Sequence, residues 1–177
     1  MAFKIFISHS VAPKELGIAY AIANEGAKRG AVPYIPDRDW NHSEEIPDRI
    51  YAHLQNADYI LAIATSSGFH LEWLNKEVNK AAKEKKPILI IADNGIDVPK
   101  KLAHIWIDRT NPSKTISRVS RHLEKFGKDK ETKAYIRLQE WSARGFIRIA
   151  SGKKVEISIP SKFPGQPLSE YLKDMRD

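Results

Sequence analysis

The chain has 177 residues, of which 42% are hydrophobic and 29% charged, so it can bury one apolar core and stay soluble. It contains no cysteine, which excludes disulfides and thiolate zinc sites, and no apolar run approaches the roughly 20 residues that a membrane span requires. The net charge of +7 is shared between residues 1–126 (18 Lys and Arg, 15 Asp and Glu) and residues 127–177 (11 Lys and Arg, 7 Asp and Glu). Such a mild excess in both parts is typical of a solvated lysine-rich surface. We therefore expect neither nucleic-acid nor membrane binding.

A strand, a helix and a second strand are predicted first. Residues 3–8 are mostly β-branched and aromatic and end in small polar residues, as in a buried strand. Because this run begins so near the N-terminus, we expect no signal peptide and a cytoplasmic location. Pro13 opens an amphipathic helix that stops at Gly30. Residues 31–35 form the second strand, at a sheet edge because Pro33 lacks an N–H. The apolar face of the helix consists of Leu16, Ala19, Tyr20, Ala23 and Ala27.

The middle of the chain alternates helices with apolar strands. After a polar loop at Pro36–Ser43, Ile46, Ile50 and Leu54 recur every four residues and predict a helix. Residues 59–64 are almost all apolar, as in a central strand covered on both faces. This alternation predicts an α/β fold with a doubly wound, flavodoxin-like, five-stranded parallel sheet. Its remaining elements are a helix over 71–85, strands over 87–91 and 104–107, and a helix from Pro112 through Leu123.

Residues 127–177 are predicted to be a small α+β extension of a main domain that covers residues 1–126. About 45 residues fold poorly alone, so we expect the extension to pack on the main domain or on a partner. It consists of a linker at 127–132, a short helix ended by Gly145, a hairpin of strands 146–150 and 155–159, and a final helix over 168–175.

Polar residues follow several predicted strands. Ligands of open parallel sheets bind beyond the carboxyl ends of the strands, near the switch in strand order. This rule brings Ser8, His9, the loop after the second strand and the loop at 65–70, which contains Ser66, around one crevice. None of these segments is a glycine-rich phosphate cradle, so neither a nicotinamide dehydrogenase of the ordinary kind nor an NTPase is expected.

The predicted helix over 71–85 carries Trp73 and Glu77 on a flank of its apolar stripe. Trp73 falls about 135° from the centre of the stripe, and Glu77 lies one turn further along the same flank. Two interpretations stay open from helix geometry. Either Trp73 packs under a loop while Glu77 pairs with Lys80 or Lys76, or the carboxylate belongs to a site. The stripe itself is Leu71, Leu74, Val78, Ala81 and Ala82.

A series of motifs occurs in a characteristic order. The chain has the run KIFISHS at 4–10, Asp37 soon after the second strand, Trp-x-x-x-Glu from Trp73 to Glu77, and the run Pro-Ile-Leu at 87–89. Over roughly residues 3–126 this series resembles the Toll/interleukin-1 receptor (TIR) domain family, in its prokaryotic NAD-cleaving form. The chain departs from the family at 43–45, where Ser-Glu-Glu stands in place of a loop that usually contains glycine.

The resemblance implies that Glu77 is the catalytic carboxylate, that Trp73 orients it, and that NAD is the substrate rather than a cofactor. No metal is implied. A carboxylate beside the ribose stabilises the positive charge that develops as nicotinamide leaves, as in glycoside hydrolysis. For His9, a capping or hydrogen-bonding role is an equal alternative to nucleotide contact. The substrate-binding residues expected are Ser8, His9, Asp37, Trp40, Ser66 and Trp73.

The resemblance further implies a homo-oligomer and a role in antiviral defence. Its product would be linear or cyclic ADP-ribose, the second acting as a signal to a downstream effector. Two alternatives stay open. One is a non-enzymatic TIR scaffold that works by assembly. The other is an enzyme similar to nucleoside 2-deoxyribosyltransferases, which share the layout and a glutamate nucleophile.

Overall fold

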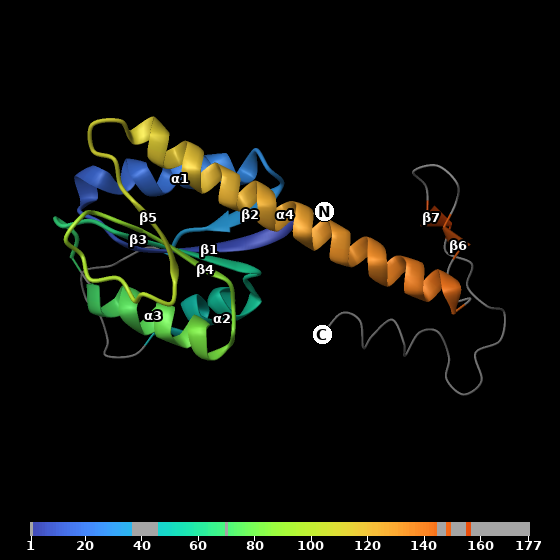
Figure 1. Ribbon diagram of the computed structural model, residues 1–177. Coiled ribbons are helices and arrows are strands. Elements are labelled where there is room, and N and C mark those ends of the chain that lie inside the picture. The colour runs from blue at the N-terminus through green and yellow to red at the C-terminus, as the bar shows by residue number, and fades with distance from the viewer. Residues whose placement is uncertain (1, 37–45, 70, 145–147, 150–154, 157–177) are drawn as a thin grey trace. The chain divides into compact units, whose positions relative to one another are not determined.

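A computed structural model describes residues 2–36, 46–69, 71–144, 148–149 and 155–156 (Figure 1). The chain divides into two units, Met1–Asp129 and Lys130–Asp177. The predicted loop that holds Asp37 and Trp40 lies largely outside the described residues, and the predicted final helix over 168–175 lies entirely outside them.

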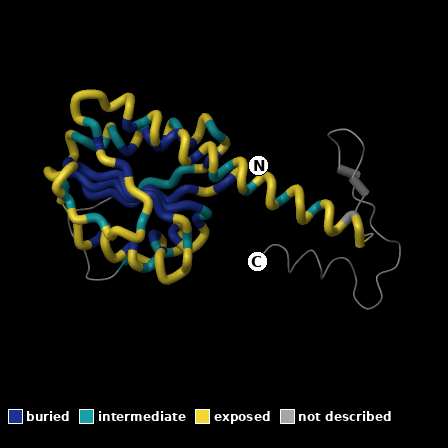
Figure 2. Tube along the Cα trace, in the orientation of Figure 1, coloured by how far each residue is buried: buried dark blue, intermediate teal, exposed yellow. Residues whose placement is uncertain are grey.

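The first unit contains five parallel strands in the order β2-β1-β3-β4-β5. This is the flavodoxin-like order, with its switch point between β1 and β3. It confirms the predicted fold class and the edge position of the second strand. β3 and β4 are buried along their whole length, as expected of apolar strands covered on both faces (Figure 2). The strands are β1 Phe3–Ser10, β2 Ala31–Tyr34, β3 Tyr59–Ala64, β4 Ile88–Ala92 and β5 Ala103–Trp106.

Helices cover both faces of the sheet, α1 and α4 on one and α2 and α3 on the other (Figure 1). Side chains alternate along each strand, so Ile5 and Ile7 enter the core under α1 and α4 while Phe6 enters the core under α2 and α3. The helical elements are η1 Pro13–Glu15, α1 Leu16–Ala27, α2 Asp48–Asn56, α3 Leu71–Lys83 and α4 Pro112–Ala143.

The buried face of α1 differs from the predicted one. Tyr20 is 55% exposed, whereas Ile22 and Gly26 are buried. A Cβ built on Gly26 would lie 3.2 Å from Ile5 Cδ1, so small residues here allow α1 to approach the sheet closely. The apolar spacing identified the helix and the buried positions of Ala19 and Ala23. It was wrong in extending the buried face to Tyr20 rather than to Ile22 and Gly26.

The buried face of α3 also differs from prediction. Leu71 is 43% exposed and Ala82 is exposed, while Trp73 and Glu77 are buried with Leu74, Val78 and Ala81. The helix is therefore rotated so that the flank carrying the aromatic and the carboxylate turns inward.

The linker predicted at 127–132 is helical, because α4 continues without interruption to Ala143. Lys128 pairs with Glu124 one turn earlier at 2.7 Å, a spacing that supports helix across Gly127. In the second unit, β6 (Arg148–Ile149) pairs antiparallel with β7 (Val155–Glu156), in agreement with the predicted hairpin. Within the described residues, no helix is both long and apolar enough to cross a membrane.

Candidate functional site

Ser8 interrupts the apolar lining of the sheet under α3. Strand alternation gives Ser8 the same side as Phe6, and its register partner on β3 is Ala62, which belongs to the core under α2 and α3. A hydroxyl in this position needs a partner because it is fully buried. Its partner is Glu77 of α3, whose Oε2 accepts the hydroxyl hydrogen of Ser8. The first strand and the third helix thus meet through a polar contact inside an apolar core.

Glu77 is 0% exposed, which is rare for a carboxylate. The two lysines that were candidate partners lie against aromatic rings. Lys76 Nζ is 5.5 Å from the centre of the Trp73 ring, and Lys80 Nζ is 4.7 Å from that of Tyr51. Burying a carboxylate costs free energy that an apolar residue would not, which makes Glu77 a candidate for a functional role.

The loop after β3 lies tightly against the end of β1. Ser10 donates its hydroxyl to the carbonyl of Phe69 at 2.7 Å, and the Thr65 amide donates to the Ser10 carbonyl at 3.0 Å. A Cβ built on Gly68 would lie 2.0 Å from the Ser10 carbonyl oxygen, so only glycine fits there. This contact fixes the loop at the switch point of the sheet, just before the helix that carries Glu77.

His9 lies on the opposite face of the sheet from Glu77. Its register partner is Ile63, which belongs to the core under α1 and α4. The ring Nε2 lies 3.2 Å from the carbonyl oxygen of Pro36 and donates to it, which ties the end of β1 to the end of β2. This contact fits the hydrogen-bonding alternative for His9.

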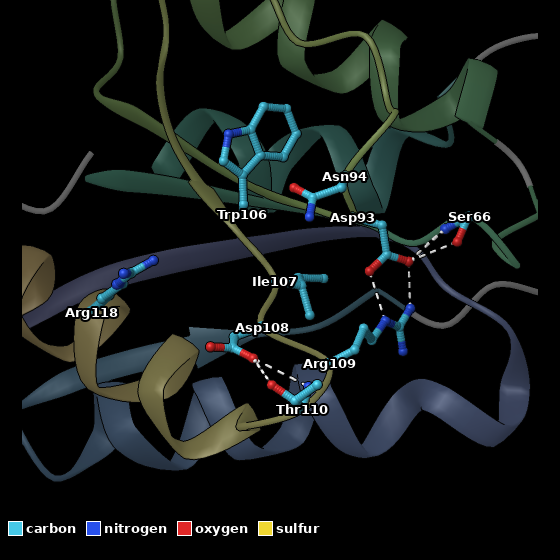
Figure 3. Close-up of a pocket in the computed structure, with 9 residues that line it drawn as sticks. All are labelled: Ser66, Asp93, Asn94, Trp106, Ile107, Asp108, Arg109, Thr110 and Arg118. Atoms are coloured by element: carbon cyan, nitrogen blue, oxygen red, sulfur yellow. Dashed lines mark hydrogen bonds and ion pairs between the residues drawn. The ribbon is translucent and has the colours of Figure 1, made fainter.

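Ser66 belongs to a second polar network at the carboxyl ends of β3 and β4. Its amide and hydroxyl donate to Asp93 Oδ2 at 2.8 and 2.9 Å. Arg109 binds the same carboxylate with two nitrogens, through Nε to Oδ1 at 2.7 Å and through Nη2 to Oδ2 (Figure 3). Its remaining nitrogen donates to Glu15 Oε1 at 2.7 Å. The network joins the ends of β3, β4 and β5 to Glu15, the last residue of η1.

Sequence reasoning missed Asp93 and Arg109. Asp93 directly follows the buried apolar strand β4, just as Ser66 lies shortly after β3. The rule that ligands bind beyond the carboxyl ends of parallel strands could therefore have identified Asp93. Nothing in the sequence pairs it with Arg109. Of the predicted site residues, the structure therefore brings Ser8 and Glu77 together, with Trp73 one turn earlier on α3, while His9 and Ser66 make separate contacts.

The polar network shifts the pKa values of its acidic members. The Arg109 guanidinium beside Asp93 holds the pKa of that carboxyl below its ordinary value of 3.8. Hydrogen bonds from Ser67, and then from Thr65 and Arg109, lower the pKa of Glu15. The pKa of Arg109 is raised, first by its hydrogen bond to Asp93. All three groups are therefore charged at neutral pH.

We expect acid to weaken the fold through Asp93. Because the folded-state pKa lies below 3.8, this carboxylate stabilises the protein above that pH, and the contribution is lost as the pH falls below it. Urea unfolding at several pH values between 2 and 7 measures the effect. Asp93→Asn should show a smaller decline in acid than the parent protein, and the exposed Asp97→Asn should decline as the parent does. An unchanged decline in Asp93→Asn would contradict this assignment.

Among the described residues, no three His, Cys, Asp or Glu side chains cluster in a way that could hold a metal ion. The candidate site consists of the buried carboxylate of Glu77, its hydrogen-bond donor Ser8, and Trp73 one turn earlier on α3.

The chain matches one protein family and is similar to several solved structures. The family model described as "TIR domain" matches residues 5–123. No curated protein matches the chain. Among solved structures, the sugar isomerase domain of the RpiR transcription factor from Sphaerobacter thermophilus is similar at a TM-score of 0.48 and 8% identity, covering 77% of this chain and 78% of that one.

Two further structures have a TM-score of 0.42. A flavodoxin from the domain Archaea is 11% identical, with 71% of this chain and 99% of that chain covered. The TIR domains of the activated Roq1 resistosome, which directly recognises the pathogen effector XopQ, are 10% identical, with 71% and 84% covered.

Proposed function

This chain belongs to the TIR domain family, and from that premise we propose that it is an enzyme that cleaves the nicotinamide–ribose bond of NAD. The observation that carries the proposal is Glu77. It ends the Trp-x-x-x-Glu motif and is fully buried against the Ser8 hydroxyl at the switch point of the sheet. Buried ionisable groups at such points are candidates for catalysis.

The chemistry suits a carboxylate. As the bond to the positively charged nicotinamide breaks, the ring becomes neutral and the ribose takes up positive charge as an oxocarbenium-like centre. A fixed anion beside the ribose stabilises that charge in the transition state more than in the ground state. Water then captures the ribose to give ADP-ribose, or an adenine nitrogen captures it to give a cyclic product.

Ser8 positions Glu77 in this proposal. Its hydroxyl donates to one carboxylate oxygen, which sets the orientation of the side chain and leaves Ser8 engaged with the protein. We assign Trp73, one turn earlier on α3, to packing that supports the carboxylate. Asp37 and Trp40 retain their proposed roles as nucleotide contacts, and both lie outside the described residues.

The burial of Glu77 requires a step before chemistry. A side chain with no exposed surface contacts NAD only after its neighbours move. We propose that assembly of several copies drives this movement and that the enzyme acts in antiviral defence, its product serving as a signal to a downstream effector. Binding that favours an open state shifts the population toward it.

The test is nicotinamide release from NAD by the purified full chain over a hundredfold range of protein concentration. We expect release whose specific rate rises with protein concentration, because assembly is a mass-action step. Release with a specific rate that does not depend on protein concentration would support the enzymatic proposal and contradict the proposal that assembly triggers it. No release at the highest concentration would contradict the enzymatic proposal and favour a scaffold. Base exchange on deoxynucleosides without NAD cleavage would favour a deoxyribosyltransferase.

A further inference from the structure

A groove follows the open edge of the sheet, where β5 is the last strand of the order. Two neighbouring cavities of about 590 and 350 Å³ form it, and Trp106 and Arg118 border both. The first cavity has the volume of a small-molecule site. We call this feature the edge groove and define it by His104, Trp106, Arg118, Arg121 and His122. The smaller cavity is lined by β5 and α4, and the larger one also by Ser66 and Asp93 at the ends of β3 and β4, whereas Glu77 and Ser8 line neither.

The edge groove has cations that the protein does not neutralise. Arg118 and Arg121 are exposed on α4, three residues apart, and therefore share one side of the helix. Neither makes an ion pair with any residue in the described part of the chain. Arg109, which also borders the larger cavity, is different because its guanidinium is committed to Asp93 and Glu15. Two unneutralised guanidinium groups side by side suit a phosphate-bearing ligand.

The edge groove also has an aromatic surface. Trp106 is 37% exposed, although burying its ring would gain free energy. The His104 ring meets it edge to face, with centroids 5.0 Å apart, and a contact of His104 Nδ1 with the Leu102 carbonyl at 3.3 Å fixes that histidine. Trp106 is thus held in place with part of its ring uncovered. Exposed, fixed aromatic rings are the surfaces on which nucleobases stack.

The two features lie on either side of the β5 backbone. In Figure 3 the Trp106 ring and the Arg118 side chain flank this strand, and Asn94 lies beside the tryptophan. Among the described strands, β5 is paired only with β4, so its other edge carries backbone donors and acceptors that a base can bind. A ligand along this edge would meet an aromatic ring, backbone polar groups and two cations in turn.

We propose that the edge groove binds a nucleotide, with its base on Trp106 and its phosphates on Arg118 and Arg121. An acidic peptide would use the cations but not the exposed ring, and a purely apolar ligand would use the ring but not the cations. Glu77 lines neither cavity, so binding here does not depend on NAD cleavage, although Ser66, one of the expected NAD contacts, borders the larger cavity. The edge groove gives the protein a second point at which a nucleotide is recognised.

Titration calorimetry of the full chain with ADP tests the proposal, because ADP lacks the nicotinamide–ribose bond. We expect binding that weakens with salt and that falls at least tenfold in both Trp106→Ala and Arg118→Gln. Trp141→Ala and Arg137→Gln are matched controls, since each removes another exposed residue of the same type on the second half of α4. Glu77→Gln should bind ADP as the parent protein does.

Several results would overturn the proposal. One is no ADP binding at millimolar concentration, and another is a loss of binding in Glu77→Gln with none in Trp106→Ala. If pyrophosphate binds as tightly as ADP, the base does not contribute to binding. If adenosine binds as tightly as ADP, the phosphates do not contribute. Binding of a single-stranded oligonucleotide without binding of ADP would replace the nucleotide by nucleic acid.

Discussion

Glu77→Gln should lower the rate of nicotinamide release by on the order of 10²–10³, the usual effect of removing one electrostatic stabiliser of a transition state. Glutamine has nearly the shape of glutamate, and its carbonyl oxygen can accept the Ser8 hydroxyl hydrogen as Oε2 does. The substitution therefore removes the negative charge while it keeps the packing. The loss should fall on kcat rather than KM, because the charge acts mainly in the transition state.

The matched control for this variant is Glu72→Gln, an exposed carboxylate in the first turn of the same helix. It should keep full activity. The free energy of unfolding of Glu77→Gln should equal or exceed that of the parent protein, because the variant no longer buries a charge. Equal loss of activity in both variants, or an active Glu77→Gln, would contradict the role of Glu77.

Gly68→Ala should destabilise the protein by roughly 3 kcal/mol, at the upper end of the cost of overpacking. The added Cβ would lie 2.0 Å from the carbonyl oxygen and 2.5 Å from the carbonyl carbon of Ser10. Both atoms belong to the backbone of β1, which is fixed by its neighbours in the sheet and cannot yield as a flexible side chain would. Urea unfolding measures the loss, and the activity should fall with it because the loop leads into α3.

Gly17→Ala is the matched control, because the same glycine-to-alanine substitution should stabilise the protein at this position. A Cβ on Gly17 meets nothing within 4 Å, and the residue lies inside α1. Alanine there should raise the free energy of unfolding by about 0.5–1 kcal/mol, because it restricts the unfolded chain. Similar stabilities for Gly68→Ala and Gly17→Ala would show that the loop after β3 moves away from β1 at little cost.

Much of the fold follows from local sequence patterns. The apolar runs at β3 and β4 indicated central strands, and Pro33 indicated an edge, because both signals depend on residues within one element. The faces of α1 and α3 were misplaced for a different reason. In each helix the buried side depends on contacts with the neighbouring sheet, where Gly26 and Glu77 are buried while Tyr20 and Leu71 stay exposed.

The candidate site was predictable only where a motif carried it. Trp73 and Glu77 were identified from the motif, yet their inward direction and the contact of Glu77 with Ser8 were not, since those residues are 69 positions apart. Arg109 joins Glu15 across 94 positions and Asp93 across 16. Such contacts arise from the crossover connections of a parallel sheet, and no local pattern encodes them.

The complete burial of Glu77 has a consequence for how fast such an enzyme runs. If NAD reaches the carboxylate only in an open state, the observed rate is the rate of the open molecule multiplied by the fraction of molecules that are open. An opening cost of about 4.1 kcal/mol leaves roughly one molecule in a thousand competent. Idle protein would then spare the NAD pool of the cell, and any contact that favours opening would raise turnover up to a thousandfold without changing a catalytic group.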